Sequence, residues 1–200
     1  MIATLLDYGA GNVTSVARAL RKLGAEVRLS ADPAEVDAAD CLILPGVGHC
    51  AALLTSLDSH GLRAPVFRAI SGGTPFLGIC LGLQALYSKS AEAPGLAGLG
   101  VFQGEVQHLP HTVKLPHMGW NQIHSTRPCR LLDGISQDDY FYFAHSYAAP
   151  PGNETAATCE HGTAFAAVIE SGRTFGVQFH PEKSGATGAR LLANFLRLAA

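Results

Sequence analysis

The segment FLGICLGLQ at residues 76–84 constrains the fold most, because its hydrophobic period changes in the middle. The first half is typical of a buried strand and the second of a helix, and Cys80 stands at the junction between Gly78 and Gly82. This spacing is the pattern of a nucleophile elbow, in which side chains at the glycine positions would collide with the neighbouring strand and helix. We therefore expect the Cys80 thiol over a helix N-terminus, where the Leu81 N–H and its neighbours favour thiolate and an oxyanion.

Cys80 has an alternative interpretation as a small buried apolar residue, which is what most free cysteines are. That interpretation suits Cys41, Cys129 and Cys159, whereas the flanking glycines set Cys80 apart. The five cysteines are irregularly spaced and form no CxxC pair, which argues against a disulfide framework and for a reducing compartment.

Strand-like and helix-like segments alternate through the first half of the chain. Apolar strands are predicted at 3–8, 25–30, 40–48 and 74–80, and helices at 13–24, 50–70 and 81–88. Asn12 is predicted to cap the first helix and Gly24 to end it. Such alternation predicts a mostly parallel sheet with helices on both faces.

The second half is richer in strands. They are predicted at 100–109, 140–147, 155–162, 163–172 and 174–180, before a closing helix at 188–200. No linker, repeat or low-complexity stretch interrupts the chain. We therefore expect one domain over residues 1–200, a three-layer α/β fold with a mostly parallel central sheet and a strand-rich second half.

Composition limits the classes of function. With 48% hydrophobic and 15% charged residues the chain can fill a sizeable core. A net charge of −2 without a basic run makes nucleic acid or an anionic membrane a poor partner. No segment reaches the roughly 18 apolar residues of a spanning helix, and the N-terminus does not resemble a secretory signal. We expect a cytoplasmic enzyme or binding domain.

A thiolate nucleophile needs a base, and the base needs an orienting group. The segment GVQFHPEKS places His180 and Glu182 at the end of a strand-like run. Because residues i and i+2 of an extended chain share a face, Glu182 is predicted to hold one ring nitrogen of His180 while the other faces sulfur. A solvated His–Glu pair at the surface is the alternative.

Other patterns are weaker. GAGNVT at 9–14 has Thr14 where a dinucleotide loop needs its third glycine. His180 and Glu182 also form the H-x-E of zinc deaminases, but no P-C-x-x-C follows them. His108 and His111 have no second pair that would complete a metal site. We therefore expect no metal and no cofactor.

The elbow GICLGLQ with the later H-P-E resembles the class I, triad-type glutamine amidotransferases. Five segments narrow the resemblance to the glutaminase subunits of imidazole glycerol phosphate synthase, over essentially the whole chain. They are DYGAGN at 7–12, LPGVG at 44–48, PHMGWN at 116–121, YFAHSY at 142–147 and GVQFHPEKS at 176–184. The resemblance implies that Cys80 attacks the carboxamide of L-glutamine and forms a thioester, that His180 transfers the protons, and that Glu182 holds the imidazole.

The resemblance also implies an oxyanion hole. One donor is the Leu81 N–H, and the other is the backbone around Gly46 and Val47. Gly46 and Gly48 would allow that peptide to flip, although a plain tight turn is the alternative for these glycines.

Substrate residues are carried over from the same family. Gln84 matches a position that contacts glutamine, and Ser146 and Tyr147 match those that meet its α-carboxylate and ammonium; Gln84 could instead be an ordinary exposed helix residue. The chain departs from the family at His49 and Cys50, after PGVG, where a small residue and an aromatic are usual. His49 could perturb the oxyanion strand.

The family acts with a partner. Ammonia in water at neutral pH is mostly ammonium, and 200 residues leave no room for an acceptor domain. The resemblance implies a heterodimer with a (β/α)₈-barrel cyclase, which makes imidazole glycerol phosphate and AICAR in histidine biosynthesis and completes the oxyanion hole on binding. Trp120 is predicted at this interface, or else in the chain's own core. Family positions near the interface or ammonia gate are Asn12, Asn121, Tyr142 and Lys183.

Two alternatives stay open. A sibling enzyme, either a free-standing γ-glutamyl hydrolase or the amidotransferase of another pathway, would share the triad but not DYGAGN and PHMGWN. A non-catalytic binding module would keep the fold alone, and the intact Cys80, His180 and Glu182 speak against it.

Overall fold

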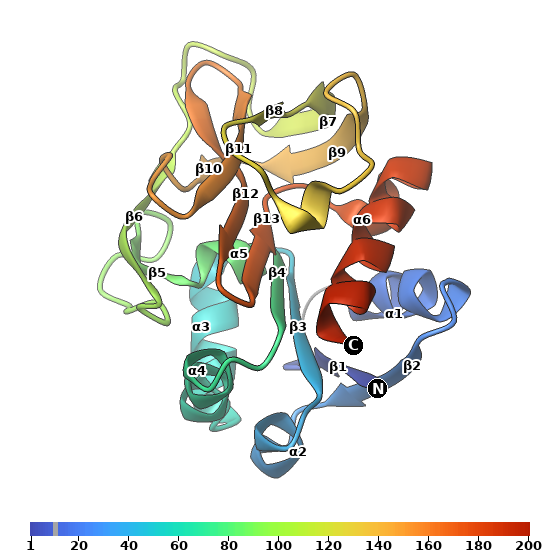
Figure 1. The fold of residues 1–200 in the computed structure, drawn as a ribbon. Coiled ribbons are helices and arrows are strands. Elements are labelled where there is room, and N and C mark those ends of the chain that lie inside the picture. Colours follow the sequence, from blue (N-terminus) through green and yellow to red (C-terminus); the bar gives the residue numbers. More distant parts are fainter. Residues whose placement is uncertain (10–11) are drawn as a thin grey trace.

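An eight-stranded sheet forms the centre of the molecule, with the strand order β2-β1-β3-β4-β13-β12-β11-β8 (Figure 1). The structure is a computed structural model that describes residues 1–9 and 12–200. The strands of this sheet are β1 (Ile2–Leu6), β2 (Glu26–Ser30), β3 (Cys41–Gly46), β4 (Phe76–Cys80), β8 (His124–Ser125), β11 (Thr155–Glu160), β12 (Ala164–Ser171) and β13 (Thr174–Val177). Neighbours from β2 to β13 run parallel, and neighbours from β13 to β8 run antiparallel.

Helices cover both faces of the parallel part, so that three layers result. The helices are α1 (Val13–Lys22), α2 (Pro33–Asp37), α3 (Cys50–Ser59), α4 (Arg63–Ser71), α5 (Leu81–Gln84) and α6 (Gly185–Ala199), with 3₁₀ turns η1 (Arg130–Leu132) and η2 (Pro181–Lys183). α1 and α6 pack on the face that carries Ile43 and Ile79. α3 and α4 pack on the face that carries Leu42 and Leu44. The alternation of buried side chains along each strand explains the two cores, and the predicted fold class is confirmed.

Two small sheets complete the strand-rich part. One contains β5 (Tyr87–Ser90), β6 (Phe102–His108) and β10 (Tyr147–Ala148), and the other pairs β7 (His117–Gln122) with β9 (Tyr140–His145). The inner face of the β7–β9 sheet buries Phe141 against Phe179 and Phe143 against Phe165, with ring centroids 4.0 Å and 5.9 Å apart. Figure 1 shows this sheet beyond the end of β4 where Cys80 lies.

Three local predictions were wrong. The helix expected over 50–70 is two helices, because Gly61 adopts a left-handed conformation with φ +65° between them. The helix expected over 81–88 ends at Gln84, and the chain turns into β5 to pair with β6. Asn12 makes no side-chain cap at α1, whereas Gly24, with φ +84°, follows the helix as predicted. The segment GAGNVT at 9–14 includes residues 10–11, which lie outside the described residues.

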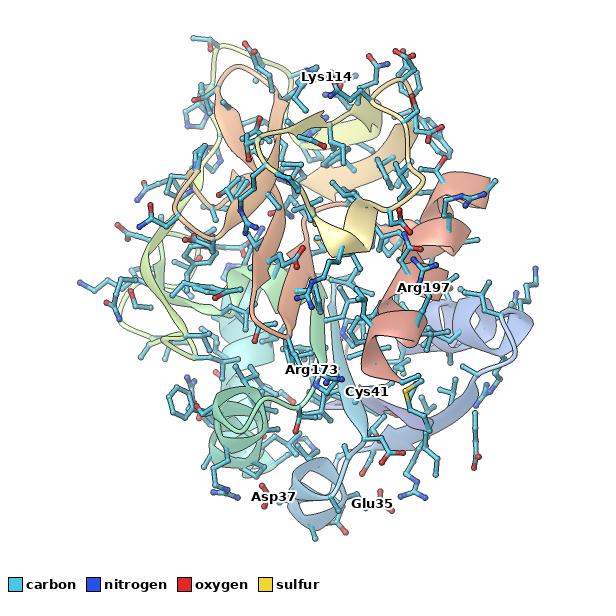
Figure 2. The ribbon with its side chains drawn as sticks, viewed as in Figure 1. Glu35, Asp37, Cys41, Lys114, Arg173 and Arg197 are labelled. Carbon is cyan, nitrogen blue, oxygen red and sulfur yellow. The ribbon has the colours of Figure 1, made fainter. Side chains whose placement is uncertain are left out.

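Charged side chains cover the outside of the molecule. Figure 2 shows Glu35 and Asp37 at one end of the molecule and Lys114 at the opposite end. No helix in the described part of the chain is long and apolar enough to cross a membrane. All five cysteines are free thiols, and residues 1–9 and 12–200 hold no group of three or more His, Cys, Asp or Glu side chains that could bind a metal ion.

Candidate active site

Cys80 occupies a strained backbone conformation at the end of β4. Its φ of 55° and ψ of −108° make it the one non-glycine residue with positive φ among the described residues. A side chain in this region is held only where the surroundings force it, and such strain collects at functional sites. The predicted elbow is therefore present, with α5 beginning at Leu81 directly after the thiol.

The glycines around the elbow are required by close packing. A Cβ on Gly78 would lie 2.5 Å from the Gly82 carbonyl oxygen, and a Cβ on Gly82 would lie 1.8 Å from the Leu44 carbonyl oxygen. Gly46 pairs with Cys80 across β3 and β4, and a Cβ there would lie 2.6 Å from the Cβ of Leu81. The sheet and helix thus approach each other at distances that only glycine permits.

His180 and Glu182 form the predicted pair, in a different backbone conformation. The His180 Nδ1 lies 3.0 Å from Glu182 Oε1, and both side chains are buried. The extended geometry expected for these residues was wrong, because Pro181 starts the 3₁₀ turn η2 that brings the carboxylate back to the ring. Asn12 Nδ2 donates to the same Glu182 oxygen over 3.0 Å, so Asn12 supports this pair.

The charges of this group favour a protonated His180 beside an ionised Glu182. Burial lowers the pKa of His180, but hydrogen bonding and charge attraction from Cys80 and Glu182 outweigh it and raise that pKa well above its usual value. Burial raises the pKa of Glu182, but its contacts with His180 and Asn12 prevail and hold it below its usual value. At neutral pH the imidazole is thus protonated beside an ionised carboxylate.

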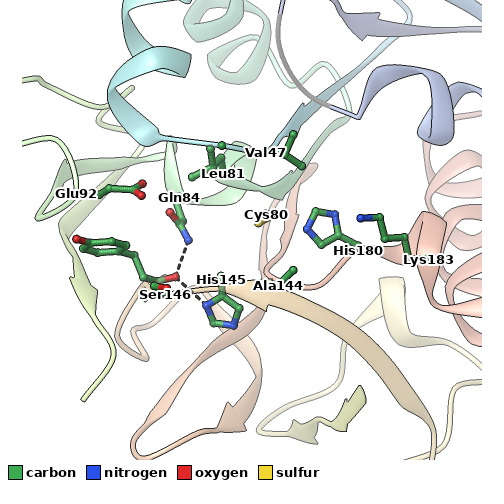
Figure 3. A pocket seen from close by; sticks show the side chains of 12 residues that line it. Val47, Cys80, Leu81, Gln84, Glu92, Ala144, His145, Ser146, His180 and Lys183 are labelled. Carbon is green, nitrogen blue, oxygen red and sulfur yellow. Dashed lines mark hydrogen bonds between the residues drawn. The ribbon is translucent and has the colours of Figure 1, made fainter. Parts of the chain in front are cut away.

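A cavity of about 220 Å³ opens over Cys80 (Figure 3). It is lined by Val47, Gly48, Cys80, Leu81, Gln84, Glu92, Ala144, His145, Ser146, Tyr147, His180 and Lys183. The structure thus gathers every predicted oxyanion and substrate residue at this cavity except Gly46, which pairs with Cys80 beneath it. The sequence interpretation missed Glu92, Ala144 and His145.

The side-chain amide of Gln84 has a fixed orientation. Its Nε2 donates to the Tyr147 carbonyl over 2.7 Å and to Gln178 Oε1 over 3.0 Å. The fully buried Gln178 in turn directs its Nε2 at Cys80 Sγ, 3.6 Å away. Both hydrogens of Gln84 are therefore engaged, and its buried Oε1 has no partner among the described residues. Gln178 was also missed, although it lies in the motif that carries His180.

Glu92 adds a carboxylate to the cavity wall (Figure 3). Its Oε2 accepts a hydrogen bond from the Cys50 N–H over 2.9 Å at the start of α3. His49, one residue earlier, accepts from the Ala51 N–H over 3.2 Å and caps the same helix. The two residues that depart from the family pattern are thus built into the start of α3.

Three of the predicted interface residues, Trp120, Tyr142 and Lys183, lie in contact through the Tyr142 ring. Trp120 is 56% exposed and meets Tyr142 edge-on with ring centroids 5.9 Å apart, and the Lys183 ammonium lies 5.7 Å from the centre of the Tyr142 ring. Trp120 is therefore not a core residue. Asn121 turns inward instead, where its Nδ2 donates to the Glu160 carbonyl over 3.1 Å.

The profile of the family described as "Glutamine amidotransferase class-I" matches residues 4–199. The chain belongs to this family. It is thus a glutamine amidotransferase, and the predicted enzyme class is confirmed. Two relatives carry the name imidazole glycerol phosphate synthase subunit HisH. That of Methanothermobacter thermautotrophicus is 47% identical over 99% of this chain and 98% of its own length. The subunit of Moorella thermoacetica is 48% identical over 96% of this chain and 92% of its own length.

Solved structures share the fold of this amidotransferase at low identity. A crystal structure described as glutamine amidotransferase aligns with a TM-score of 0.79 at 20% identity, over 100% of this chain and 99% of that one. PurLQS from Thermotoga maritima aligns with a TM-score of 0.75 at 17% identity, over 98% and 97%. These likenesses support the fold alone.

Proposed function

We propose that this amidotransferase is the glutaminase subunit of imidazole glycerol phosphate synthase. It hydrolyses L-glutamine to glutamate and ammonia and passes the ammonia to a (β/α)₈-barrel cyclase subunit, which makes imidazole glycerol phosphate and AICAR in L-histidine biosynthesis. The observation that carries the proposal is the strained Cys80 beside a buried His180–Glu182 pair in a chain 47% identical to a HisH subunit over nearly its whole length. Residues 1–200 act as one domain, in the cytoplasm.

The first half of the reaction forms a thioester. The Cys80 thiolate attacks the carboxamide carbon of glutamine, and the carbonyl oxygen becomes an oxyanion. His180, protonated in the resting pair, gives its proton to the departing nitrogen, so that the C–N bond breaks and neutral ammonia leaves. A γ-glutamyl thioester and a neutral imidazole remain.

The second half releases glutamate. Neutral His180 takes a proton from water, and the hydroxide attacks the thioester carbon. The tetrahedral species collapses with cleavage of the C–S bond, which restores the thiolate beside the imidazolium. Glu182, fixed by Asn12, holds the ring orientation and its charge through both steps.

Two backbone donors serve the oxyanion. Leu81 supplies its N–H at the first residue of α5, and the Val47 segment follows Gly46, the partner of Cys80 on β3, and lines the cavity beside Leu81 (Figure 3). An aimed donor of this kind typically contributes about 3 kcal/mol to the transition state. Gly48 has a φ of +96°, a conformation that is unfavourable for a residue with a side chain. Glycine at this position therefore allows the cyclase to reorient the Val47 peptide.

The far end of the cavity holds the amino-acid part of glutamine. Glu92 supplies a negative charge for the α-ammonium, and the free Oε1 of Gln84 accepts a hydrogen from the substrate. Backbone and hydroxyl donors at Ser146 and Tyr147 meet the α-carboxylate.

The partner docks on the exposed face of the β7–β9 sheet. Met118 and Trp120 stand 65% and 56% exposed there, and large apolar side chains of this kind are typical interface anchors. Lys183, beside Tyr142, lies between this face and the cavity and controls the passage of ammonia.

The experiment that tests the proposal compares two nitrogen sources in the reconstituted complex with the cyclase and its ribotide. With wild-type chain, product forms from glutamine or from an ammonium salt. With Cys80→Ala, product should form from the ammonium salt only. Product from glutamine with Cys80→Ala would contradict Cys80 as the nucleophile. No product from glutamine with the wild-type chain would favour a non-catalytic binding module, and no complex with the cyclase would favour a sibling enzyme.

A further inference from the structure

A line of hydrogen-bonded imidazoles connects strand β7 with the wall of the active-site cavity. His117 Nδ1 lies 3.0 Å from His145 Nε2, and His145 Nδ1 lies 2.9 Å from the carbonyl oxygen of Tyr147. Both rings are buried. Neither the triad nor the oxyanion hole uses His117, which stands between the exposed Met118 side of β7 and the substrate site.

The direction of each bond follows from the last acceptor. A carbonyl oxygen only accepts, so His145 must carry its hydrogen on Nδ1. Burial and the neighbouring His117 lower the pKa of His145 to about 3, so its Nε2 has a free lone pair at neutral pH. His117 must therefore donate from Nδ1 to that lone pair.

At the outer end of the line, Asn121 donates a hydrogen bond to His117. Burial and the charge of His161 lower the pKa of His117 to about 4, so its Nε2 is an acceptor at neutral pH. Asn121 Nδ2 lies 3.3 Å from that atom. The amide of Asn121 cannot reverse, because its Oδ1 accepts from the Gln122 N–H and its Nδ2 also donates to the Glu160 carbonyl.

The line ends on the atom that also orients Gln84. The bonds from Gln84 and His145 meet at one oxygen in Figure 3, which is the carbonyl oxygen of Tyr147. Because this carbonyl takes one hydrogen of Gln84 and Gln178 takes the other, the Gln84 Oε1 is left for the substrate. A shift of the Tyr147 carbonyl would therefore move both cavity residues together.

We infer that His117 is a positioning residue for the amino-acid end of glutamine: its Nδ1–H donates to Nε2 of His145 and fixes that ring, and the Nδ1–H of His145 fixes the Tyr147 carbonyl against Gln84. The inference rests on the proposed glutaminase function for its kinetic part. Its structural part, the tautomer of His145, stands independently of the reaction.

A purely packing role for His117 is the competing explanation. Its ring stacks on His161 and Phe143, with centroids 4.2 Å and 4.7 Å apart. A matched pair of variants separates the two roles, because His117→Asn and His117→Leu lose the stacking equally. The Asn amide nitrogen occupies the place of Nδ1 and can still donate to His145, whereas Leu cannot.

The experiment reads the His145 tautomer and glutamine kinetics in the same proteins. Long-range ¹H–¹⁵N correlation spectra at neutral pH report the tautomer, and glutamate release by the cyclase complex gives KM and kcat. We expect Nδ1–H in the wild type and in His117→Asn, with KM within about twofold between them. In His117→Leu we expect the same tautomer, because the Tyr147 carbonyl still accepts from Nδ1, but a shifted Nε2 signal, because that atom no longer accepts a hydrogen bond. We also expect a KM raised by about tenfold with kcat nearly unchanged, because the hydrogen bond that fixes the His145 ring is lost.

Several results would overturn the inference. An Nε2–H tautomer of His145 in the wild type would overturn it. This result needs no variant, so the test remains decisive even if His117→Leu does not fold. Equal KM values for the Asn and Leu variants would leave packing as the sole role of His117. A wild-type complex that releases no glutamate would instead contradict the proposed function, and the tautomer would still be read.

Discussion

The elbow at Cys80 and the β7–β9 sheet hold their side chains in opposite ways. At the elbow the nucleophile is buried, and its backbone is held between glycines at which an added Cβ would lie less than 3 Å from its neighbours. On the β7–β9 sheet Phe141 and Phe143 are buried, while Met118, Trp120 and Tyr140 remain exposed on the outer side. The difference indicates that the reactive group is set by the fold itself, whereas the outer sheet offers a surface for a partner.

The two regions are nevertheless joined at η2. The His180 N–H donates to the Tyr142 carbonyl over 2.8 Å, and the Tyr142 N–H donates to Ser184 Oγ over 3.0 Å. Tyr142 of strand β9 is therefore hydrogen-bonded to both residues that flank the turn η2, which carries Glu182 and Lys183. A partner that moves β9 can act on the triad directly.

Removal of the nucleophile should give the largest effect. Cys80→Ala is expected to lower kcat for glutamate release by about 10⁴-fold or more, because no other group forms the thioester. Glutaminase assays of the cyclase complex test this. Cys159→Ala, which removes a buried thiol on β11, is the matched control and should keep the activity. Comparable losses in both variants would point to general destabilisation.

Glu182→Gln should give the next largest effect, a loss of about 10²- to 10⁴-fold in kcat, because the ring loses its orienting charge. Glu182 raises the pKa of His180, so its removal should move the alkaline limb of the kcat/KM profile to lower pH. Glu35→Gln changes a half-buried carboxylate on α2, far from the cavity, and serves as control. An alkaline limb that stays in place would contradict the assignment of His180 as the protonated group.

Trp120→Ala should separate the two regions, because it leaves the elbow untouched. We expect the affinity for the cyclase to fall by about 2 kcal/mol, or roughly 30-fold, with unchanged glutamate release by the isolated chain. Titration calorimetry measures the affinity. Phe67→Ala on α4 removes an aromatic side chain that is 46% exposed elsewhere and should bind normally. Equal affinities for the two variants would place the partner on another face.

The smallest effect concerns stability in acid. In the unfolded chain, histidines become protonated below their ordinary pKa of about 6.5. In the folded protein, the buried His117 and His145 stay neutral down to about pH 4. The free energy of unfolding should therefore fall as pH decreases from 6.5 to 4, by about 1.4 kcal/mol per pH unit for each such histidine. His180, protonated in both states there, adds nothing.

Denaturant unfolding at a series of pH values measures this slope. His117→Asn should reduce the slope by the contribution of one histidine, about 1.4 kcal/mol per pH unit. An unchanged slope would contradict the neutral state of His117 in the folded protein.

Local steric rules made much of the catalytic half predictable. Two glycines around Cys80 and the change of period in one segment were enough for the elbow, and apolar strands predicted the parallel sheet. The early end of α5 was not predictable, because residues from Leu81 to Tyr87 are all buried, Gln84 included, and the pattern of side chains gives no sign of where the helix stops. The pairing of β5 with β6 decides its end.

Long-range contacts account for the site residues that the sequence interpretation missed. Glu92 reaches the cavity only because the start of α3 donates to it, 42 positions away in sequence. Gln178 matters through Gln84 and Cys80, which lie on other elements. His145 was passed over between Ser146 and Ala144 because its partner, His117, lies on a strand that was not predicted.

The proposed coupling of the two subunits is measured by glutamate release from L-glutamine, first by the purified chain alone and then with the cyclase barrel and its ribotide. We expect low turnover by the isolated chain and a rise by orders of magnitude in the complex, because we propose that the partner docks on β7–β9 and completes the oxyanion hole at Val47. Full turnover by the isolated chain would contradict it and indicate a free-standing hydrolase.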